Sequence, residues 1–328
     1  MSQANNDAAR ETAGRSQVRF VTIGEKNETQ RIDNFLLSLL KGIPKSKVYR
    51  VIRKGEVRIN KKRCKPETKL ALGDVVRIPP VFGLQGDRTP PKVSDSLSDY
   101  LENAVLYEDK ALMVINKPSG LAVHGGSGIH LGLIEALRQR RPEHAFLELV
   151  HRIDRDTSGC VLVAKSRSAL RFMHELFRND RVDKTYHLAV FGRWARHRRK
   201  VDAPLRKNEL QSGERMVTVS QDGKPSQTLF RIIETSTHFS LLEAKPVSGR
   251  THQIRVHAAH SGHPIVGDAK YIPSSQTEFH GMKKSRLMLH ARSLECDLPD
   301  GNRLSVAAPY DEPFTRNLIQ MGFSVDAL

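Results

Sequence analysis

The chain has few cysteines and no long apolar run. Its 328 residues include three cysteines, Cys64, Cys160 and Cys296, which lie far apart and form no Cys-x-x-Cys pair. They exclude a cysteine-based metal centre, and their sparse, odd number suits a reducing cytosol. No apolar stretch approaches the roughly 20 residues of a bilayer-spanning helix, and the polar N-terminus lacks a signal-peptide core. We therefore expect a cytoplasmic protein without a membrane partner.

Negative charge is also scarce. The sequence holds 53 Lys and Arg against 36 Asp and Glu, which gives a formal net charge of +17. Between Arg19 and Arg77 there are 16 basic and 6 acidic residues, so a net charge of +10 lies in under a fifth of the length. A basic excess of this size indicates a polyanionic partner such as nucleic acid.

The basic N-terminal segment has the periodicity of two short helices. Apolar residues spaced like one helix face predict a helix over 31–40, ended by Gly42, and Pro44 begins a second helix that stops at Gly55. A charged face that is merely solvated is the usual alternative for such a pattern. The second helix and the turn after it carry the side chains that we expect to bind RNA: Lys45, Lys47, Arg50, Arg53, Lys54, Lys61, Lys62 and Arg63.

This segment resembles the αL RNA-binding motif of small-subunit ribosomal protein four. The matching stretches are Arg-Ile-Asp at 31–33, Gly-Glu-Val-Arg-Ile-Asn at 55–60 and Gly-Asp at 73–74. The resemblance implies docking to folded RNA through phosphate contacts and shape, because side chains read the deep groove of A-form RNA poorly.

Changes in composition suggest the domain limits. Residues 1–16 are polar and have no periodicity, which is typical of a disordered tail. Four prolines and two glycines between Pro79 and Ser98 indicate a linker. We therefore expect a disordered tail over 1–16, an RNA-binding domain over 17–80, a linker over 81–98 and a larger domain over 99–328.

One polar stretch separates two apolar runs near the middle of the chain. His-Arg-Ile-Asp-Arg-Asp-Thr-Ser-Gly at 151–159 lies between Phe146–Val150 and Cys160–Ala164. This order predicts strand, loop, strand. The loop would hold two carboxylates and two guanidiniums at the rim of a sheet, where functional loops usually lie. A charged surface turn with structural salt bridges is the alternative interpretation.

The loop resembles the His-Arg-Leu-Asp-x-x-Thr-Ser-Gly motif of the bacterial large-subunit ribosomal RNA pseudouridine synthases, with Ile153 in place of Leu. Asn-Lys-Pro-Ser-Gly at 116–120 and Val-His-Gly-Gly-Ser-Gly at 123–128 match the first motif of that family. Further matches are Lys-Thr-Tyr at 184–186, Gly-Arg-Thr-His-Gln-Ile-Arg at 249–255 and Leu-Met-Leu-His-Ala at 287–291. Residues 211–215 and 223–226 resemble one branch of the family.

The resemblance implies an enzyme that isomerises specific uridines of 23S ribosomal RNA to pseudouridine. The implied fold is α+β, with a mixed, largely antiparallel sheet and a cleft across its centre. Asp154 would be the catalytic carboxylate, Tyr186 would stack on the target base and Arg255 would pair with Asp154. The expected substrate contacts are Arg152, Lys184 and Leu289, the last of which would pack against Tyr186.

The sequence indicates no cofactor and no metal. The Gly-rich stretch at 124–128 lacks both the Gly-Lys-Ser/Thr ending and the Gly-x-Gly-x-x-Gly register, so we expect no nucleotide cofactor. His257, His260 and His263 are three residues apart, but no Glu or Cys is spaced to complete a zinc site. Isomerisation needs neither redox chemistry nor an energy source. We expect a monomer whose partner is large-subunit ribosomal RNA.

Several alternatives stay open. Asp154 could act as a nucleophile at the anomeric carbon or as a base on the ribose. The stretch Gly249–His257 fits either a strand or the start of a helix. The chain could instead be an RNA-binding protein without catalysis, or a synthase of another structured RNA. A glycoside hydrolase that uses Asp154 and Asp156 is disfavoured, because carboxylates two residues apart on a loop seldom flank a sugar at the required separation.

Overall fold

The computed structural model describes residues 18–40, 43, 45–80, 92–125, 131–209, 215–272 and 285–324. The chain divides into two compact units, 1–89 and 90–328. The expected tail over 1–16, most of the expected linker, Gly42 and Pro44 lie outside the described residues, as do Gly126–Gly128 and Gln211–Glu214. No helix in the described part of the chain is long and apolar enough to cross a bilayer.

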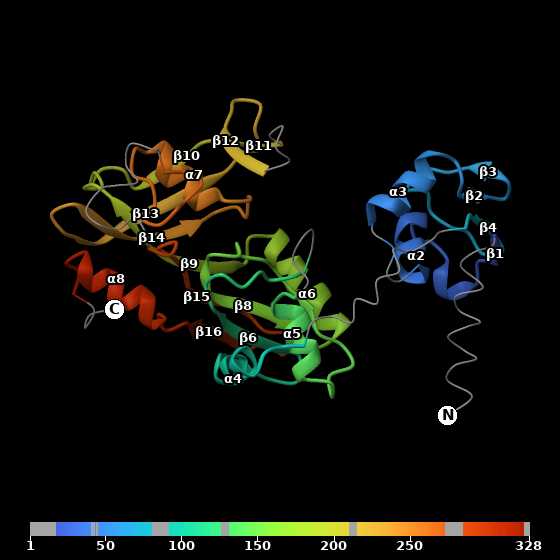
Figure 1. The fold of residues 1–328 in the computed structure, drawn as a ribbon, viewed down its shortest axis with the longest axis horizontal. Coiled ribbons are helices and arrows are strands. Elements are labelled where there is room, and N and C mark those ends of the chain that lie inside the picture. Colours follow the sequence, from blue (N-terminus) through green and yellow to red (C-terminus); the bar gives the residue numbers. More distant parts are fainter. Residues whose placement is uncertain are drawn as a thin grey trace. The chain divides into compact units, whose positions relative to one another are not determined.

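The N-terminal unit is a four-stranded antiparallel sheet with two helices on one face (Figure 1). The strand order is β1 (Arg19–Thr22), β4 (Val75–Ile78), β2 (Arg58–Ile59) and β3 (Lys62–Arg63), and a short 3-10 helix, η1 (Glu25–Asn27), follows β1. Helices α2 (Ile32–Leu39) and α3 (Lys45–Arg53) lie where the apolar spacing predicts them. Their apolar faces and the inward residues of the sheet, such as Val76 and Ile78, form a separate core.

The larger unit contains a ten-stranded sheet. Along the main path its order is β10 (Lys200–Asp202), β13 (Gln227–Thr235), β14 (Phe239–Pro246), β9 (Val182–Phe191), β15 (Leu289–Asp297), β8 (Ser158–Ala164), β6 (Leu112–Lys117) and β5 (Val105–Glu108). Strand β16 (Arg303–Ala307) pairs with β15, and β7 (Glu148–Leu149) pairs with β8. Only the β15–β8 pair is parallel among the described strands. The mixed, largely antiparallel α+β fold is therefore confirmed.

In the described residues, a hairpin and five helices complete the larger unit. Strands β11 (Leu205–Glu209) and β12 (Arg215–Val219) form the hairpin. The helices are α4 (Asp95–Asn103), α5 (Leu133–Arg140), α6 (Arg167–Arg178), α7 (Gln253–His260) and α8 (Glu312–Gln320). Helix α4 begins inside the stretch expected to be a linker, because the Ser94 hydroxyl accepts a hydrogen bond from the backbone N–H of Leu97 and caps the first turn.

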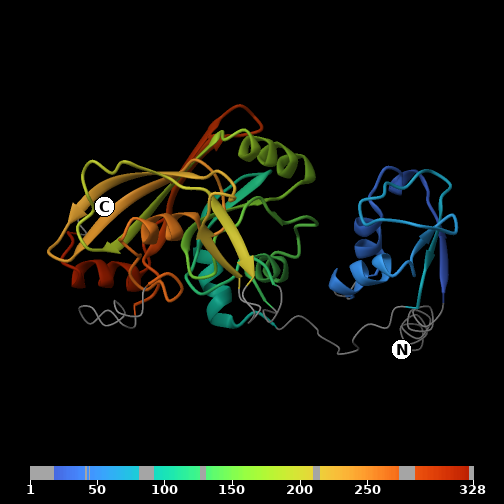
Figure 2. The same ribbon diagram turned by 90° about the horizontal axis from the view of Figure 1, so that it is seen from above.

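Strands β6 and β8 are buried on both faces. Leu112 and Leu162 pack with α6, whereas Met113 and Val161 pack with α4 and α5. Figure 2 shows α6 on one side of these strands and α4 and α5 on the other. Strands covered on both sides read as continuous apolar runs, which explains the Cys160–Ala164 stretch. The other half of the sheet packs with α7 and α8, so the loop that leads into β8 lies at the centre of the unit.

Candidate active site

The loop over residues 150–157, which leads into β8, is called here the central loop. It ends where β8 and β15 come into close contact. Gly159 has a φ of +105°, and a Cβ atom at this position would lie 2.2 Å from the carbonyl oxygen of Ala291 on β15. Only glycine accepts both this backbone conformation and this approach. The Gly at the end of the polar stretch is therefore required by the parallel pairing of the two strands.

Ser158 ties the same point to the neighbouring strand. Its hydroxyl lies 2.7 Å from Nδ1 of His290 and accepts a hydrogen bond of 2.7 Å from Nη2 of Arg286. Arg286 also pairs with Asp311. Burial lowers the pKa of His290 to about 3, so its ring is neutral near pH 7. These contacts fix the start of β8 against β15.

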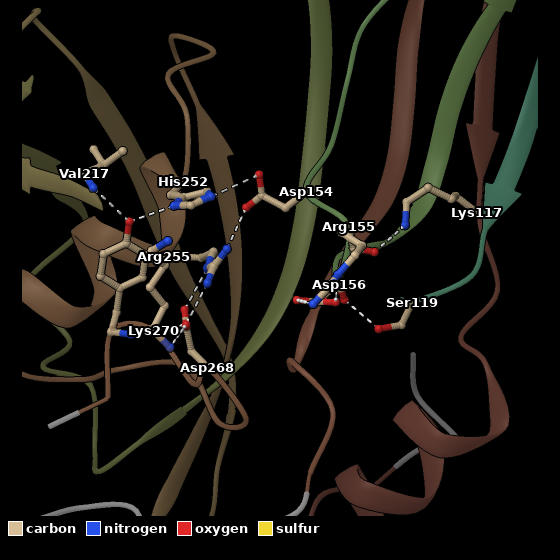
Figure 3. A network of polar contacts seen from close by, with 11 residues as sticks. Lys117, Ser119, Asp154, Arg155, Asp156, Val217, His252, Arg255, Asp268 and Lys270 are labelled. Atoms are coloured by element: carbon tan, nitrogen blue, oxygen red, sulfur yellow. Dashed lines mark hydrogen bonds and ion pairs between the residues drawn. The ribbon is translucent and has the colours of Figure 1, made fainter. Parts of the chain in front are cut away.

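A buried lysine holds the other side of the loop. The Lys117 side chain is 0% exposed, and its Nζ donates to the carbonyl oxygens of Pro118, Leu121 and Arg155 at 2.7, 2.7 and 2.8 Å. The Ser119 hydroxyl donates to the carbonyl oxygen of Asp156 at 2.7 Å. Burial lowers the pKa of Lys117 to about 7. The turn after β6 thus holds the backbone of the central loop (Figure 3).

Asp154 and Arg255 meet across the cleft, as the resemblance implies. Nη1 of Arg255, on α7, donates to Oδ2 of Asp154 at 3.0 Å, and the Asp154 side chain is 22% exposed. Two other donors of the guanidinium, Nε and Nη2, bind the two carboxylate oxygens of Asp268, each at 2.8 Å. Burial opposes the charge of Arg255, but the bonds to Asp268 and the two carboxylate charges outweigh it and raise the pKa. The guanidinium stays charged.

His252 makes a second approach to the Asp154 carboxylate. Its Nε2 lies 3.7 Å from Oδ1 of Asp154. Its Nδ1 lies 2.7 Å from the hydroxyl of Tyr271, which accepts a hydrogen bond of 3.2 Å from the backbone N–H of Val217 in the hairpin. Burial lowers the pKa of His252 in spite of the Asp154 charge. Figure 3 shows His252 and Arg255 approaching Asp154 from the same side.

The cleft has an aromatic wall. Tyr186 on β9 pairs with Ala291 on β15, and Leu289 is two residues away on the same strand. Both side chains line the cleft with Asp154 and Arg255, and the exposed Arg152 lies at its rim. Burial, followed by the Asp154 charge, raises the pKa of Tyr186, so its hydroxyl is protonated near pH 7.

Five of the six expected catalytic and substrate-contacting residues therefore share one cleft. The exception is Lys184, whose Nζ lies 5.5 Å from the centre of the Phe177 ring on α6. Lys184 is not among the residues that line the cleft. Any contact between Lys184 and RNA would therefore occur outside it.

Three residues of the site are not predicted from the sequence. Asp268 and Tyr271 lie in a loop without periodicity, and His252 belongs to a matching motif but receives no role from it. The Val-Gly-Asp order at 266–268, where a carboxylate follows an apolar residue and a glycine, is the only local signal for Asp268.

Two of the three spaced histidines, His257 and His263, have structural partners. Nδ1 of His257 lies 2.8 Å from the hydroxyl of Thr228, and its Nε2 lies 3.0 Å from the carbonyl oxygen of Ala203. Nδ1 of His263 lies 2.8 Å from the carbonyl oxygen of Phe191. The described residues contain no group of three or more side chains that could hold a metal ion.

The residues expected to bind RNA cluster on the N-terminal unit. Arg50 and Arg53 are exposed on the side of α3 opposite its buried residues, and Lys47 is half-buried. The ammonium group of Lys45 lies 5.7 Å from the centre of the Tyr49 ring. The remaining exposed members are Lys54, Lys61, Lys62 and Arg63, in the turn after α3 and in the β2–β3 hairpin.

Comparison with known proteins accounts for both units. A family model described as RNA pseudouridylate synthase matches residues 111–260, and an S4 domain model matches residues 30–76. Ribosomal large subunit pseudouridine synthase C of Yersinia pestis is 52% identical over 308 residues, which cover 93% of this chain and 96% of that protein. The protein of the same name from Escherichia coli K12 is 50% identical over 314 residues, with coverages of 92% and 96%. A solved structure, human RNA pseudouridylate synthase domain containing 4, is 26% identical with a TM-score of 0.57, and covers 69% of this chain and 95% of that one.

Proposed function

The chain belongs to the ribosomal large subunit pseudouridine synthase family, and from this premise we propose that it isomerises specific uridines in 23S ribosomal RNA with Asp154 as its catalytic carboxylate. It is an RNA pseudouridine synthase, hence an isomerase. One observation carries the assignment of Asp154. Its carboxylate is held through one oxygen by Arg255 at 3.0 Å, in a cleft that Tyr186 and Leu289 line.

The reaction conserves all atoms. The bond from N1 of uracil to C1′ of the ribose breaks, a bond from C5 to C1′ forms, the proton on C5 leaves and N1 gains a proton. No electron acceptor or energy source is needed, so the proposed enzyme uses no nucleotide cofactor. Asp154 acts as a nucleophile at C1′ or as a base on the ribose, and both roles need an ionised carboxylate. Arg255 donates a hydrogen bond of 3.0 Å to this carboxylate.

The substrate uridine must leave its stack to reach Asp154. The Tyr186 ring offers a flat face for the extruded base, and Leu289 supports that ring from the neighbouring strand. Arg152 lies exposed at the rim of the cleft, where it can meet the phosphate beside the extruded nucleotide. In this proposal the protein acts as a cytoplasmic monomer on large-subunit ribosomal RNA, and the basic side chains of α3 and the following hairpin bind RNA phosphates.

The Asp154→Asn variant tests the proposal. The amide keeps the shape of the side chain but is neither a nucleophile nor a base, so pseudouridine formation should stop while RNA binding persists. Tritium release from uridine labelled at C5 in large-subunit RNA measures the reaction. Turnover within about tenfold of wild type, a barrier change of about 1.4 kcal/mol, would overturn the assignment.

Asp156→Asn is the matched control. The Asp156 carboxylate pairs with the exposed Arg155 at 3.0 Å rather than with Arg255, so this variant should stay active. If both substitutions abolished activity and the wild-type chain released free uracil, a pair of carboxylates acting in hydrolysis would be the better account.

A further inference from the structure

The outer face of the N-terminal sheet carries a line of four side chains, of which the proposed function uses only Arg63. The strand register pairs Phe20 on β1 with Arg77 on β4, Arg77 with Arg58 on β2, and Arg58 with Arg63 on β3. Directly paired residues project from the same face of a sheet. The four side chains therefore form one row across all four strands, called here the Phe20–Arg63 row. The opposite face of the sheet packs on α2 and α3.

Backbone carbonyl groups hold the three arginines of this row. Arg63, Arg58 and Arg77 donate to the carbonyl oxygens of three consecutive residues, Lys54–Glu56, at 2.9, 3.3 and 2.6 Å. Gly55 has a φ of +73°, and a Cβ atom there would lie 2.2 Å from Nε of Arg63, so the turn needs glycine. A guanidinium has five N–H donors. Most of them therefore remain available for a ligand.

Among the residues that the structure describes, no ion pair with a carboxylate neutralises the three arginines of the row. The acidic side chain beside the row, Glu56, lies 4.0 Å from Lys54 instead. Like charges directly opposite each other on adjacent strands are destabilising. An anion that met the row would relieve this repulsion, and three neighbouring guanidiniums fit a chain of phosphates better than a single anion.

The row ends in an exposed aromatic ring. Phe20 is 66% exposed and Val75, on the same face, is 39% exposed. One concave surface of the unit is lined by aromatic, aliphatic and basic side chains: Phe20, Val75, Arg58, Arg77, Lys54 and Lys61. Flat sheet faces that combine aromatic and basic side chains stack unpaired bases. A duplex would present its phosphates to such a face and leave the ring without a partner.

We propose that the Phe20–Arg63 row binds a single-stranded segment of ribosomal RNA, with an unpaired base stacked on Phe20 and the adjoining phosphates on Arg77 and Arg58. The proposal rests on the proposed function and extends it, because it adds a single-strand contact on the sheet to the expected phosphate contacts of α3. The occupant is RNA rather than protein, since the unneutralised positive charge calls for a polyanion.

Binding to the full chain tests the proposal. The probes are a labelled single-stranded oligouridylate of roughly ten nucleotides and a duplex RNA of equal length, followed by fluorescence anisotropy over a salt series. Phe20→Ala should weaken single-strand binding about 5- to 150-fold without changing the salt slope, because it removes no charge. Phe20→Tyr should restore binding. Arg58→Gln should weaken binding and reduce the slope by about 0.7.

Leu72→Ala is the matched control, because Leu72 is 55% exposed on the same unit but does not line the concave surface. Unchanged single-strand affinity in Phe20→Ala, or an equal loss for the duplex, would overturn the proposal. These measurements report binding alone. If Phe20→Ala binds normally while Asp154→Asn is inactive, the single-strand contact is refuted and the proposed function stands.

Discussion

Arg255 and Asp268 form a buried bidentate ion pair, with both N–O distances at 2.8 Å and side chains that are 9% and 0% exposed. Asp268 also accepts hydrogen bonds from the backbone N–H groups of Lys270 and Tyr271 at 3.0 and 3.3 Å. The loop thus fixes the carboxylate, and the carboxylate fixes the guanidinium. Nη1 of Arg255 is the donor that reaches Asp154. Asp268 therefore positions the charge beside the proposed catalytic group without reaching it.

We predict that Asp268→Asn slows the reaction at saturating RNA by about 100-fold, the cost of a small displacement in a catalytic site. An amide offers one acceptor oxygen to the two donors of Arg255 and removes the charge that orients them. RNA affinity should stay near that of wild type, since Asp268 is buried. Single-turnover rates and binding titrations separate the two effects.

Asp297→Asn is the control for this prediction, because Asp297 pairs with Arg181 at 2.8 Å and the two side chains are 38% and 61% exposed. Exposed pairs contribute about 0–1 kcal/mol, so this variant should match wild type. A normal rate in Asp268→Asn would show that Arg255 does not need its ion pair with Asp268 to reach Asp154.

Two variants of Tyr186 distinguish the role of its ring from the role of its hydroxyl. Tyr186 is half-buried and lines the cleft, and no hydrogen bond of its hydroxyl is found among the described residues. In the proposed function, the substrate would bind this hydroxyl. Tyr186→Phe should keep RNA affinity and slow the chemical step, whereas Tyr186→Ala should also lose affinity because the stacking face is gone. If Tyr186→Phe reacts at the wild-type rate, the residue acts by stacking alone.

The elements predicted from the sequence are those with a clear period or a matching motif. Helices α2 and α3 follow from the one-sided spacing of their apolar residues, most of which are buried in the structure. Helix α7 could not be told from a strand, because every residue from Gln253 to Ala258 is buried. A helix buried on all sides has no apolar stripe, so periodicity carries no signal there.

The candidate site shows a similar division. The resemblance brings Asp154, Arg255 and Tyr186 together, and the structure places them in one cleft. Asp268 stays hidden, because a loop residue 13 positions after Arg255 becomes its partner only once the chain has folded. Lys117 belongs to a matching motif, yet its role depends on three carbonyl groups whose positions no sequence pattern encodes.

We predict that His151 makes the protein less stable in mild acid. Burial and the nearby Lys184 lower the pKa of His151 to about 4, whereas a histidine in an unfolded chain titrates near pH 6.5. Between about pH 6.5 and pH 4 the unfolded state binds a proton that the native state does not. The free energy of unfolding therefore falls as the pH falls through this window, by up to about 1.4 kcal/mol per pH unit for this one residue.

His151→Gln should remove this part of the pH dependence, because glutamine does not titrate. The variant should still fold, because the glutamine oxygen can accept the hydrogen bond that Nε2 of His151 receives from the Leu162 N–H. Urea unfolding at several pH values checks it. Trp194 is the only tryptophan of the sequence and is buried in the larger unit, so its fluorescence reports that unit alone. His197→Gln, at an exposed position, is the control. An unchanged slope in His151→Gln would contradict the prediction.

Deleting residues 1–80 should weaken RNA binding more than it harms the catalytic centre. The N-terminal unit has its own core, formed by residues between Ile23 and Ile78, and the core clusters of the larger unit contain only its own residues. The deletion takes away the net charge of +10 between Arg19 and Arg77. Because phosphate contacts release counterions, the affinity of the full chain should fall steeply with salt and that of the truncated chain less steeply.

The kinetic consequence is a raised KM with kcat largely kept, since the unit supplies binding that is common to the ground and transition states. A salt series of affinities, with single-turnover rates on large-subunit RNA fragments for both chains, measures the two quantities. Loss of kcat at saturating RNA would mean that the N-terminal unit helps to assemble the cleft. An unchanged affinity and salt slope would mean that the basic face of α3 is merely solvated, and that the larger unit alone selects the RNA.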